Sequence, residues 1–172
     1  TSIAYTYNGY IVSGTSGDSI SFCEKNAFYL QLNNMGDSIS SKIFDCDNEW
    51  GSYGGPVLST SDSNFIFRYF IDAAGISNYS RIIKTNTNDS IFWTAQGGND
   101  WIRQTSSMKL DSLDYLLHIY SNDISGYSYT GKIDPFGQTV SSLAIVDTNF
   151  VDFYNSHSVT SSIDGGILTG GT

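Results

Sequence analysis

The chain of 172 residues has little positive charge and no long hydrophobic run. Lys and Arg together number 8, against 17 Asp and Glu, and the formal net charge is −9. Proteins that grip nucleic acid need clusters of Lys and Arg facing the phosphates, so a nucleic-acid-binding role is excluded. No apolar run reaches the roughly 18 residues that a membrane-spanning helix requires, and no membrane span is expected. Acidic, Lys-poor compositions of this kind are common outside cells, which favours a secreted or cell-surface protein.

Helix-forming segments are also missing. The chain has two Pro and no long stretch rich in Leu, Ala, Glu and Lys, which argues against a helical protein. What is abundant instead is Tyr (12), Phe (10) and Gly (17), with many Ser, Thr and Asn. This mixture is typical of β-strands joined by tight turns.

Cysteine is scarce, and the two that occur, Cys23 and Cys46, lie on either side of one strand-rich segment. In an oxidising compartment they are expected to form a disulfide if their Cα atoms come within about 7 Å of each other. The alternative is a pair of half-buried free thiols. Two isolated cysteines lack the paired spacing of a zinc site, so no metal is expected there.

Catalytic motifs are absent as well. The chain has no Gly-x-Ser-x-Gly elbow, no phosphate-binding Gly-rich loop with Lys, and no His-Glu-x-x-His helix. His118 lies in an apolar run and is interpreted as a hydrogen-bonded strand histidine, while His157 lies in a polar loop. We therefore expect no catalytic residue, no cofactor and no enzymatic activity.

Two short segments are candidates for binding. The acidic cluster Asp45–Glu49 offers oxygen ligands for calcium, but it lacks the spacing of an EF-hand and is read as a solvated turn. Trp50 is followed by Gly51–Gly55, which predicts a loop, and a loop tryptophan is a candidate platform for stacking sugars. The other strand aromatics are expected to pack between sheets.

The feature that organises the chain is an internal repeat of about fifty residues. The first element is a strand-like run marked by Ile11, Ile66, Leu116 and Ile167, with gaps of 55, 50 and 51 residues. The second element is a turn followed by a strand, and it has three copies. These are Gly36–Ile39, Asn88–Ile91 and Gly137–Val140. A period of this length is typical of β-propeller blades.

The repeat predicts one all-β domain over residues 1–172, built from four-stranded antiparallel meanders that resemble propeller blades. The approximate units are 1–55, 56–104, 105–155 and a partial unit at 156–172. The Gly-Gly pairs, including Gly54-Gly55, are expected at turns. The alternative fold is a β-sandwich with incidental near-repetition. Three and a fraction blades cannot close a ring alone, so either the chain is a segment of a longer protein or partner chains complete it.

The repeat resembles a known family. Asn8–Thr15 and Phe28–Asp37 are similar to the tandem propeller-like repeats (GGYIxxG…YLxKLDxxG) of secreted Bacteroidota proteins, many of them exported by the type IX system. The third unit keeps Lys132–Gly137 and the partial unit keeps Asp164–Gly170, whereas the second unit lacks the Gly-Gly-Tyr opening. The resemblance implies secretion and specifies no catalytic residue.

The same resemblance implies glycosylation. The tripeptide Asp-Ser-(Ile/Leu) is similar to the O-glycosylation acceptor of that phylum, and it occurs four times, at Ser19, Ser38, Ser90 and Ser112. A glycan on such a serine adds bulk and shields strand edges. The alternative interpretation is structural, because Asp37 and Asp89 fall in expected hairpin turns, where Asp-Ser is favoured anyway.

Together these features predict a structural protein that associates with copies of itself, as an oligomer or filament, or mediates adhesion. The physical reason is the fractional repeat, which leaves sheet edges for a neighbouring copy. The alternative function is a lectin-like carbohydrate-binding module that uses Trp50.

Overall fold

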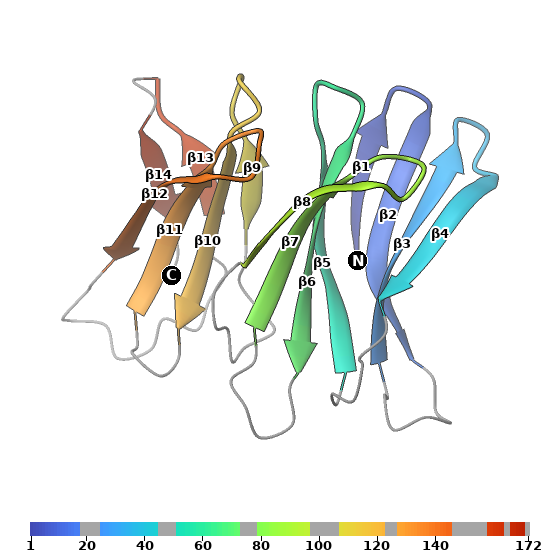
Figure 1. The fold of residues 1–172 in the computed structure, drawn as a ribbon, viewed down its shortest axis with the longest axis horizontal. Helices are drawn as coiled ribbons and strands as arrows, with labels where there is room; N and C mark the ends of the chain where they lie inside the picture. Colours follow the sequence, from blue (N-terminus) through green and yellow to red (C-terminus); the bar gives the residue numbers. More distant parts are fainter. Residues whose placement is uncertain are drawn as a thin grey trace.

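The chain folds into four antiparallel β-sheets that stand one behind another in a computed structural model (Figure 1). The structure describes residues 1–17, 25–44, 51–72, 79–96, 107–122, 127–145, 158–163 and 166–170. Within these ranges every regular element is a strand and none is a helix. The all-β prediction is therefore confirmed.

Each sheet is a meander in which consecutive strands are hydrogen-bonded neighbours. The first sheet contains β1 (Ser2–Thr6), β2 (Gly9–Gly17), β3 (Lys25–Asn33) and β4 (Ser38–Phe44). The second contains β5 (Gly51–Ser59), β6 (Phe65–Asp72), β7 (Tyr79–Thr85) and β8 (Ile91–Gln96). The third contains β9 (Met108–Leu110), β10 (Leu116–Asn122), β11 (Tyr127–Ile133) and β12 (Thr139–Ile145). The fourth has two described strands, β13 (Ser158–Ser161) and β14 (Ile167–Gly170).

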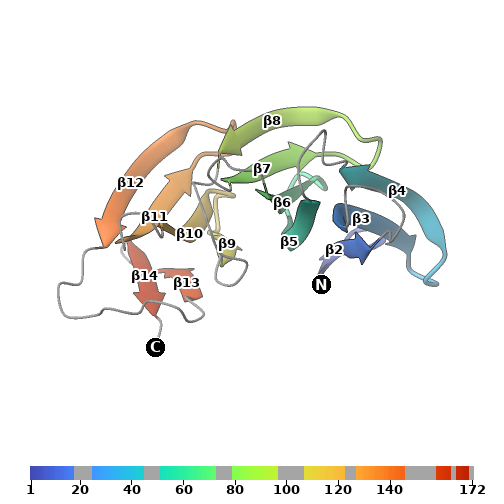
Figure 2. The same cartoon turned by 90° about the horizontal axis from the view of Figure 1, so that it is seen from below.

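The four sheets follow an arc (Figure 2). The last strand of each full sheet, β4, β8 or β12, lies on the convex side, and β9 and β13 lie on the concave side. The described strands leave the arc open between the first and fourth sheets. The prediction of repeated four-stranded meanders is thus confirmed, and closure into a propeller ring stays a prediction.

Four of the described hairpins, all at the same end of the strands, share a five-residue turn (Figure 1). An Asn or Asp opens the turn, and its side-chain oxygen accepts hydrogen bonds from the backbone N–H groups two and four residues later, as Asn33 does from Met35 (2.8 Å) and Asp37 (2.9 Å). The same pair of bonds forms at three further turns. These open at Asn86, Asp111 and Asp134. A short polar side chain that bonds its own backbone in this way favours a turn over a longer strand.

The first hairpin of each sheet opens at an equivalent residue, so residues of the four sheets can be aligned with one another by position. Thr60, Asp111 and Ser162 each donate a backbone bond to the carbonyl four residues later, at 3.0, 3.0 and 2.9 Å. Thr6 opens the corresponding shorter turn and pairs with Gly9. Strand register agrees with this frame, since the residue three before each opening pairs across the hairpin in the same way. These pairs are Ile3–Val12, Val57–Phe67, Met108–His118 and Val159–Thr169.

Every sheet then has a rear face, which is directed at the preceding sheet, and a front face, which is directed at the next. Between the first and second sheets, front-face residues Ile11 and Tyr29 pack against rear-face residues Val57, Phe65 and Phe67. Between the second and third, Ile66 and Ile82 pack against Met108, Leu116 and Ile133. Between the third and fourth, Leu117 and Ile119 pack against Val159 and Ile167. The core is therefore a series of sheet-on-sheet layers.

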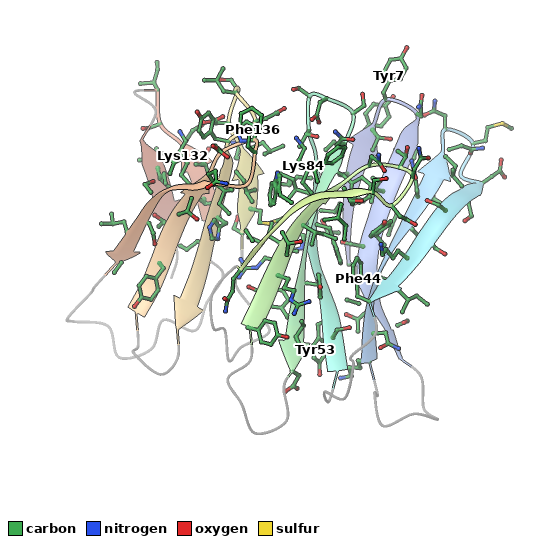
Figure 3. All side chains as sticks on the ribbon, viewed as in Figure 1. Tyr7, Phe44, Tyr53, Lys84, Lys132 and Phe136 are labelled. Atoms are coloured by element: carbon green, nitrogen blue, oxygen red, sulfur yellow. The ribbon has the colours of Figure 1, made fainter. Side chains whose placement is uncertain are left out.

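Aromatic rings fill the layer between the first two sheets. Phe44 stacks on Tyr69 with ring centroids 4.6 Å apart, and Tyr29 meets Phe65 edge-on at 4.9 Å. Figure 3 shows Phe44 at the end of β4 beside the second sheet. Edge-on and offset contacts of this kind stabilise a core beyond the apolar area that they bury.

The prediction of a loop and turn at Gly51–Gly55 is wrong, because this segment is the start of β5. It pairs with β6, with a bulge between Gly54 and Val57, and neither Gly54 nor Gly55 has a positive φ. A Cβ atom on Gly54 would lie 2.0 Å from the Gly14 carbonyl oxygen, so the glycine lets two sheets approach closely. The expected unit boundary at 55/56 falls within this strand.

Candidate interaction surfaces

The rear face of the first sheet is apolar and has no sheet packed on it among the described residues. Its side chains are Ile3, Tyr5, Tyr10, Val12, Phe28, Leu30, Leu32 and Ile43, which lie opposite one another in the strand register. Ile3 and Tyr5 are each 64% exposed, and Ile43 is 62% exposed, while the others are half-buried. The equivalent residues of the next sheets, such as Val57 and Met108, are buried. Soluble monomers rarely leave a contiguous apolar surface of more than a few hundred Å² exposed, so this face is a candidate interface.

The front face of the fourth sheet lies at the other end of the series. Its central residue is Leu168, which is 55% exposed. The equivalent residues of the other sheets, Ile11, Ile66 and Leu117, are buried against the following sheet at 0–1% exposure. Leu168 therefore occupies a position that is covered in each of the other sheets.

The hairpin turns at one end of the strands carry large exposed apolar side chains. The first and third sheets each present two and the fourth presents one: Tyr7, Met35, Leu113, Phe136 and Ile163. Figure 3 shows Tyr7 and Phe136 at this end. In the second sheet the two corresponding turns carry polar residues, Asp62 and Asn88. Side chains that project from turns in this way suit contact with another surface.

Polar contacts hold the turns of neighbouring sheets together. Asp114 accepts bonds from the backbone N–H (2.9 Å) and the hydroxyl of Ser61. The Tyr29 hydroxyl donates to Asp89, and burial together with this carboxylate raises the pKa of the tyrosine. These bonds fix the angle between sheets at the hairpin end.

On the convex side of the arc, Trp93 of the second sheet contacts the third sheet. Its indole N–H donates to the Pro135 carbonyl at 3.0 Å, and its ring lies against Gly137, where a Cβ atom would come within 2.6 Å. The prediction that strand aromatics pack between sheets is confirmed for this tryptophan.

In the second and third sheets, a lysine forms an ion pair with an aspartate of the first hairpin turn. The Lys84 ammonium lies 2.8 Å from Asp62, and the Lys132 ammonium lies 3.2 Å from Asp111 (Figure 3). Burial of the Asp62 carboxyl raises its pKa, but hydrogen bonds from Lys84, Thr60 and Asn64 outweigh this effect and lower the pKa to about 2. The Asp62 carboxylate is therefore ionised at neutral pH, and its hydrogen bonds stabilise the turn.

Of the two histidines, His118 lies within the described residues. His118 is buried in β10, its ring lies against Gly131, and burial together with the nearby Arg68 lowers its pKa to about 3. Arg68 is itself buried and donates to the Ile119 carbonyl (3.1 Å) and to the Ser80 hydroxyl (2.9 Å). The interpretation of His118 as a strand residue is confirmed. His157 lies outside the described residues.

A shallow groove of about 330 Å³ lies on the outer strands of the second sheet. Tyr79, Arg81, Thr94, Ala95 and Gln96 line it. The Arg81 guanidinium lies 5.5 Å from the centre of the Tyr79 ring, which forms a flat surface edged by polar groups. Such a surface suits a polar ligand with a flat face, as a sugar ring has.

Several predicted site residues lie outside the described residues. These are Cys23 and Cys46, Ser19, Trp50 and the acidic cluster at 45–49. Ser38, Ser90 and Ser112 are described, and all three are exposed in or beside hairpin turns at one end of the strands. Ser38 and Ser90 are therefore accessible for modification. Asp37 and Asp89, which precede them, lie in turns, as the structural interpretation of Asp-Ser requires.

In the described ranges no three His, Cys, Asp or Glu side chains gather closely enough to hold a metal ion. The same part of the chain contains no helix long and apolar enough to cross a membrane. The features that remain are surfaces for contact.

Comparisons with known proteins give the fold alone. No protein-family model and no curated protein matches the chain. A solved structure, described as a protein of unknown function from Bacteroides caccae, is similar with a TM-score of 0.57 and 12% sequence identity. The match covers 98% of this chain and 51% of the other, so the chain spans about half the length of that protein.

Sequence reasoning missed the rear face of the first sheet. The available signal was that β1 and β2 carry apolar residues on both faces, with Ile3 and Tyr10 on one face and Ala4 and Ile11 on the other. Strands that are apolar on both faces are typical of sheets covered on both sides.

Proposed function

We propose that the protein is an extracellular structural protein, without catalytic activity, that associates with copies of itself. The observation that supports this most directly is the exposed rear face of the first sheet. Ile3, Tyr10 and Val12 occupy positions whose counterparts in the second sheet, Val57, Phe65 and Phe67, pack against the first sheet. Covering such a face removes apolar surface from water, which is the main driving force for stable association.

Two further features support an extracellular location. The chain is acidic with a net charge of −9, and it resembles repeats of secreted Bacteroidota proteins. The exposed Ser38, Ser90 and Ser112 suit O-linked glycans at the hairpin turns. The apolar turn residues at that end suit adhesion to another surface.

Sedimentation velocity over a range of concentrations tests the proposal. We expect the average mass to rise with concentration well above the 18.8 kDa of one chain. A chain that stays monomeric up to near-millimolar concentration contradicts the proposal.

The second candidate function is a lectin-like module. The groove beside Tyr79 and Arg81 favours it, because an aromatic ring next to polar side chains suits a sugar. On a glycan array, binding that Arg81→Ala abolishes and Leu143→Ala on β12 leaves unchanged supports this function. If the protein binds no glycan on the array, the lectin-like function is contradicted.

A further inference from the structure

The groove on the outer strands of the second sheet is built by alternate residues of two neighbouring strands. Tyr79 and Arg81 lie on β7, and Thr94 and Gln96 lie on β8, where Gln96 pairs with Arg81. Residues two apart on a strand point to the same face, so these four side chains share one face of the sheet. Tyr69 of β6 pairs with Arg81 on that face and packs against the first sheet. The groove therefore lies on the rear face of the second sheet, beside the layer that joins it to the first.

Arg81 is the charged group of this groove, and its side chain is exposed. A hydrogen bond with Tyr69 raises the pKa of the guanidinium, against the opposing effect of burial. Its Nη2 group donates to the Tyr79 hydroxyl at 3.5 Å. Both of these partners are neutral hydroxyls, and among the described residues no carboxylate lies within ion-pair distance of Arg81. A guanidinium has five N–H donors, so two hydroxyls leave donors for a ligand in the groove.

A second cation lies in the same layer between the first two sheets. The Lys42 ammonium of β4 is 5.8 Å from the centre of the Phe44 ring, and Phe44 stacks on Tyr69 with ring centroids 4.6 Å apart. Aromatic rings thus connect Lys42 to Arg81, and no carboxylate of the described ranges pairs with either cation. The chain has 17 Asp and Glu against 8 Lys and Arg, so acidic groups are plentiful elsewhere. Two cations without an acidic partner create a local positive potential, which attracts a negatively charged ligand.

We infer that the groove binds an acidic saccharide, a sugar whose ring carries a carboxylate, and that Arg81 holds this carboxylate. This inference rests on the proposed lectin-like function and specifies its ligand. The planar fork of a guanidinium matches a carboxylate through two parallel hydrogen bonds. The Tyr79 ring offers an apolar surface to the sugar ring, and Thr94 and Gln96 offer polar groups to its hydroxyls. The volume of about 330 Å³ suits a small saccharide, since small-molecule pockets span roughly 300–1,000 Å³.

A matched pair of ligands tests the inference. Methyl glucuronide and methyl glucoside differ only in that a carboxylate of the first replaces a hydroxymethyl group of the second. In an NMR titration of the chain, we expect the glucuronide to bind at least about tenfold more tightly, because charge-assisted bidentate hydrogen bonds are stronger than neutral ones.

Substitutions at Arg81 test whether this preference depends on the groove. Arg81→Gln should lower the glucuronide affinity by about tenfold, to that of the glucoside, and Arg81→Lys should restore only part of it, because lysine keeps the charge and lacks the fork. Arg81 is exposed, so both variants should keep the amide spectrum of the folded chain. Lys109→Gln is the matched control, because it removes one positive charge from β9 of the third sheet and should change neither affinity.

The remaining outcomes separate this inference from the lectin-like function. If both sugars bind equally well, or if only neutral glycans bind on the array, carboxylate recognition is overturned and the lectin-like function stands. Binding of a sulfated galactoside in place of the glucuronide overturns the choice of a carboxylate. If Lys109→Gln weakens glucuronide binding as much as Arg81→Gln does, the attraction is a general effect of charge and the groove is not the site. A chain that binds neither sugar and no glycan on the array overturns both the inference and the lectin-like function.

Discussion

Replacing Gly54 by Ala tests the idea that the first two sheets are held at a distance only glycine permits. The added Cβ atom would lie 2.0 Å from the Gly14 carbonyl oxygen, 2.5 Å from the Gly14 carbonyl carbon and 2.9 Å from its Cα. All three atoms are backbone, so no side-chain rotation relieves the clash. Non-bonded contacts of this kind need roughly 3.5 Å, so the sheets must separate locally by roughly 1.5 Å.

The cost follows from what that separation breaks. The Ser13 hydroxyl donates to the Gly55 carbonyl at 2.6 Å, and the Gly54 N–H donates to the Thr15 hydroxyl at 3.1 Å. Overpacking costs about 1–3 kcal/mol, and each lost hydrogen bond adds about 0.5–1.5 kcal/mol. We therefore expect Gly54→Ala to lower the free energy of unfolding by about 3 kcal/mol, measured by urea denaturation with circular dichroism.

Gly36→Ala is the matched control, because it adds the same methyl group at a position where no neighbouring atom lies close. Gly36 has a φ of 90°, and a Cβ atom there meets nothing within 4 Å, so only backbone strain of about 1 kcal/mol is expected. A Gly54→Ala variant that is no less stable than Gly36→Ala contradicts the close-approach argument.

Three further predictions concern single contacts. Gly131→Ala brings a Cβ atom within 2.3 Å of the buried His118 ring and should cost about 1–3 kcal/mol of unfolding free energy, and this cost should be smaller in a chain that already carries His118→Ala. If Gly131→Ala costs the same in both backgrounds, the contact with the ring is not the cause. Trp93→Phe removes a hydrogen bond of 3.0 Å to the next sheet and should cost about 0.5–1.5 kcal/mol in the same assay, whereas an unchanged midpoint would show that the bond contributes nothing. The folded-state pKa of Asp62 is about 2, below the usual 3.8, so its ionised form stabilises the fold above about pH 4 and this contribution disappears as the pH falls toward 2. Because the Asp62 side chain is itself half-exposed, we expect less than about 1 kcal/mol, seen as a smaller loss of stability in acid for Asp62→Asn than for the unaltered chain; equal losses would refute it.

Local chemistry in the sequence determined the strands and the hairpins. Alternating apolar and polar residues over Ala27–Leu32 predicted β3, because side chains on a strand point to opposite faces in turn. Asn33, Asn86 and Asp134 direct the turns through bonds to their own backbone, which depend only on residues within four positions. Interactions of such short range can be read from the chain without knowledge of the rest of the fold.

Only the tertiary structure decided how the sheets meet, because those contacts join residues about fifty positions apart. Gly54-Gly55 has the composition of a turn, and it forms a strand since the Gly14 backbone lies against it. Likewise, Ile3 and Val57 are equivalent apolar strand residues, and nothing in their local sequence distinguishes the one that is 64% exposed from the one that is 2% exposed. Among the described residues a sheet packs on Val57 and none packs on Ile3, and this packing is a property of the whole array.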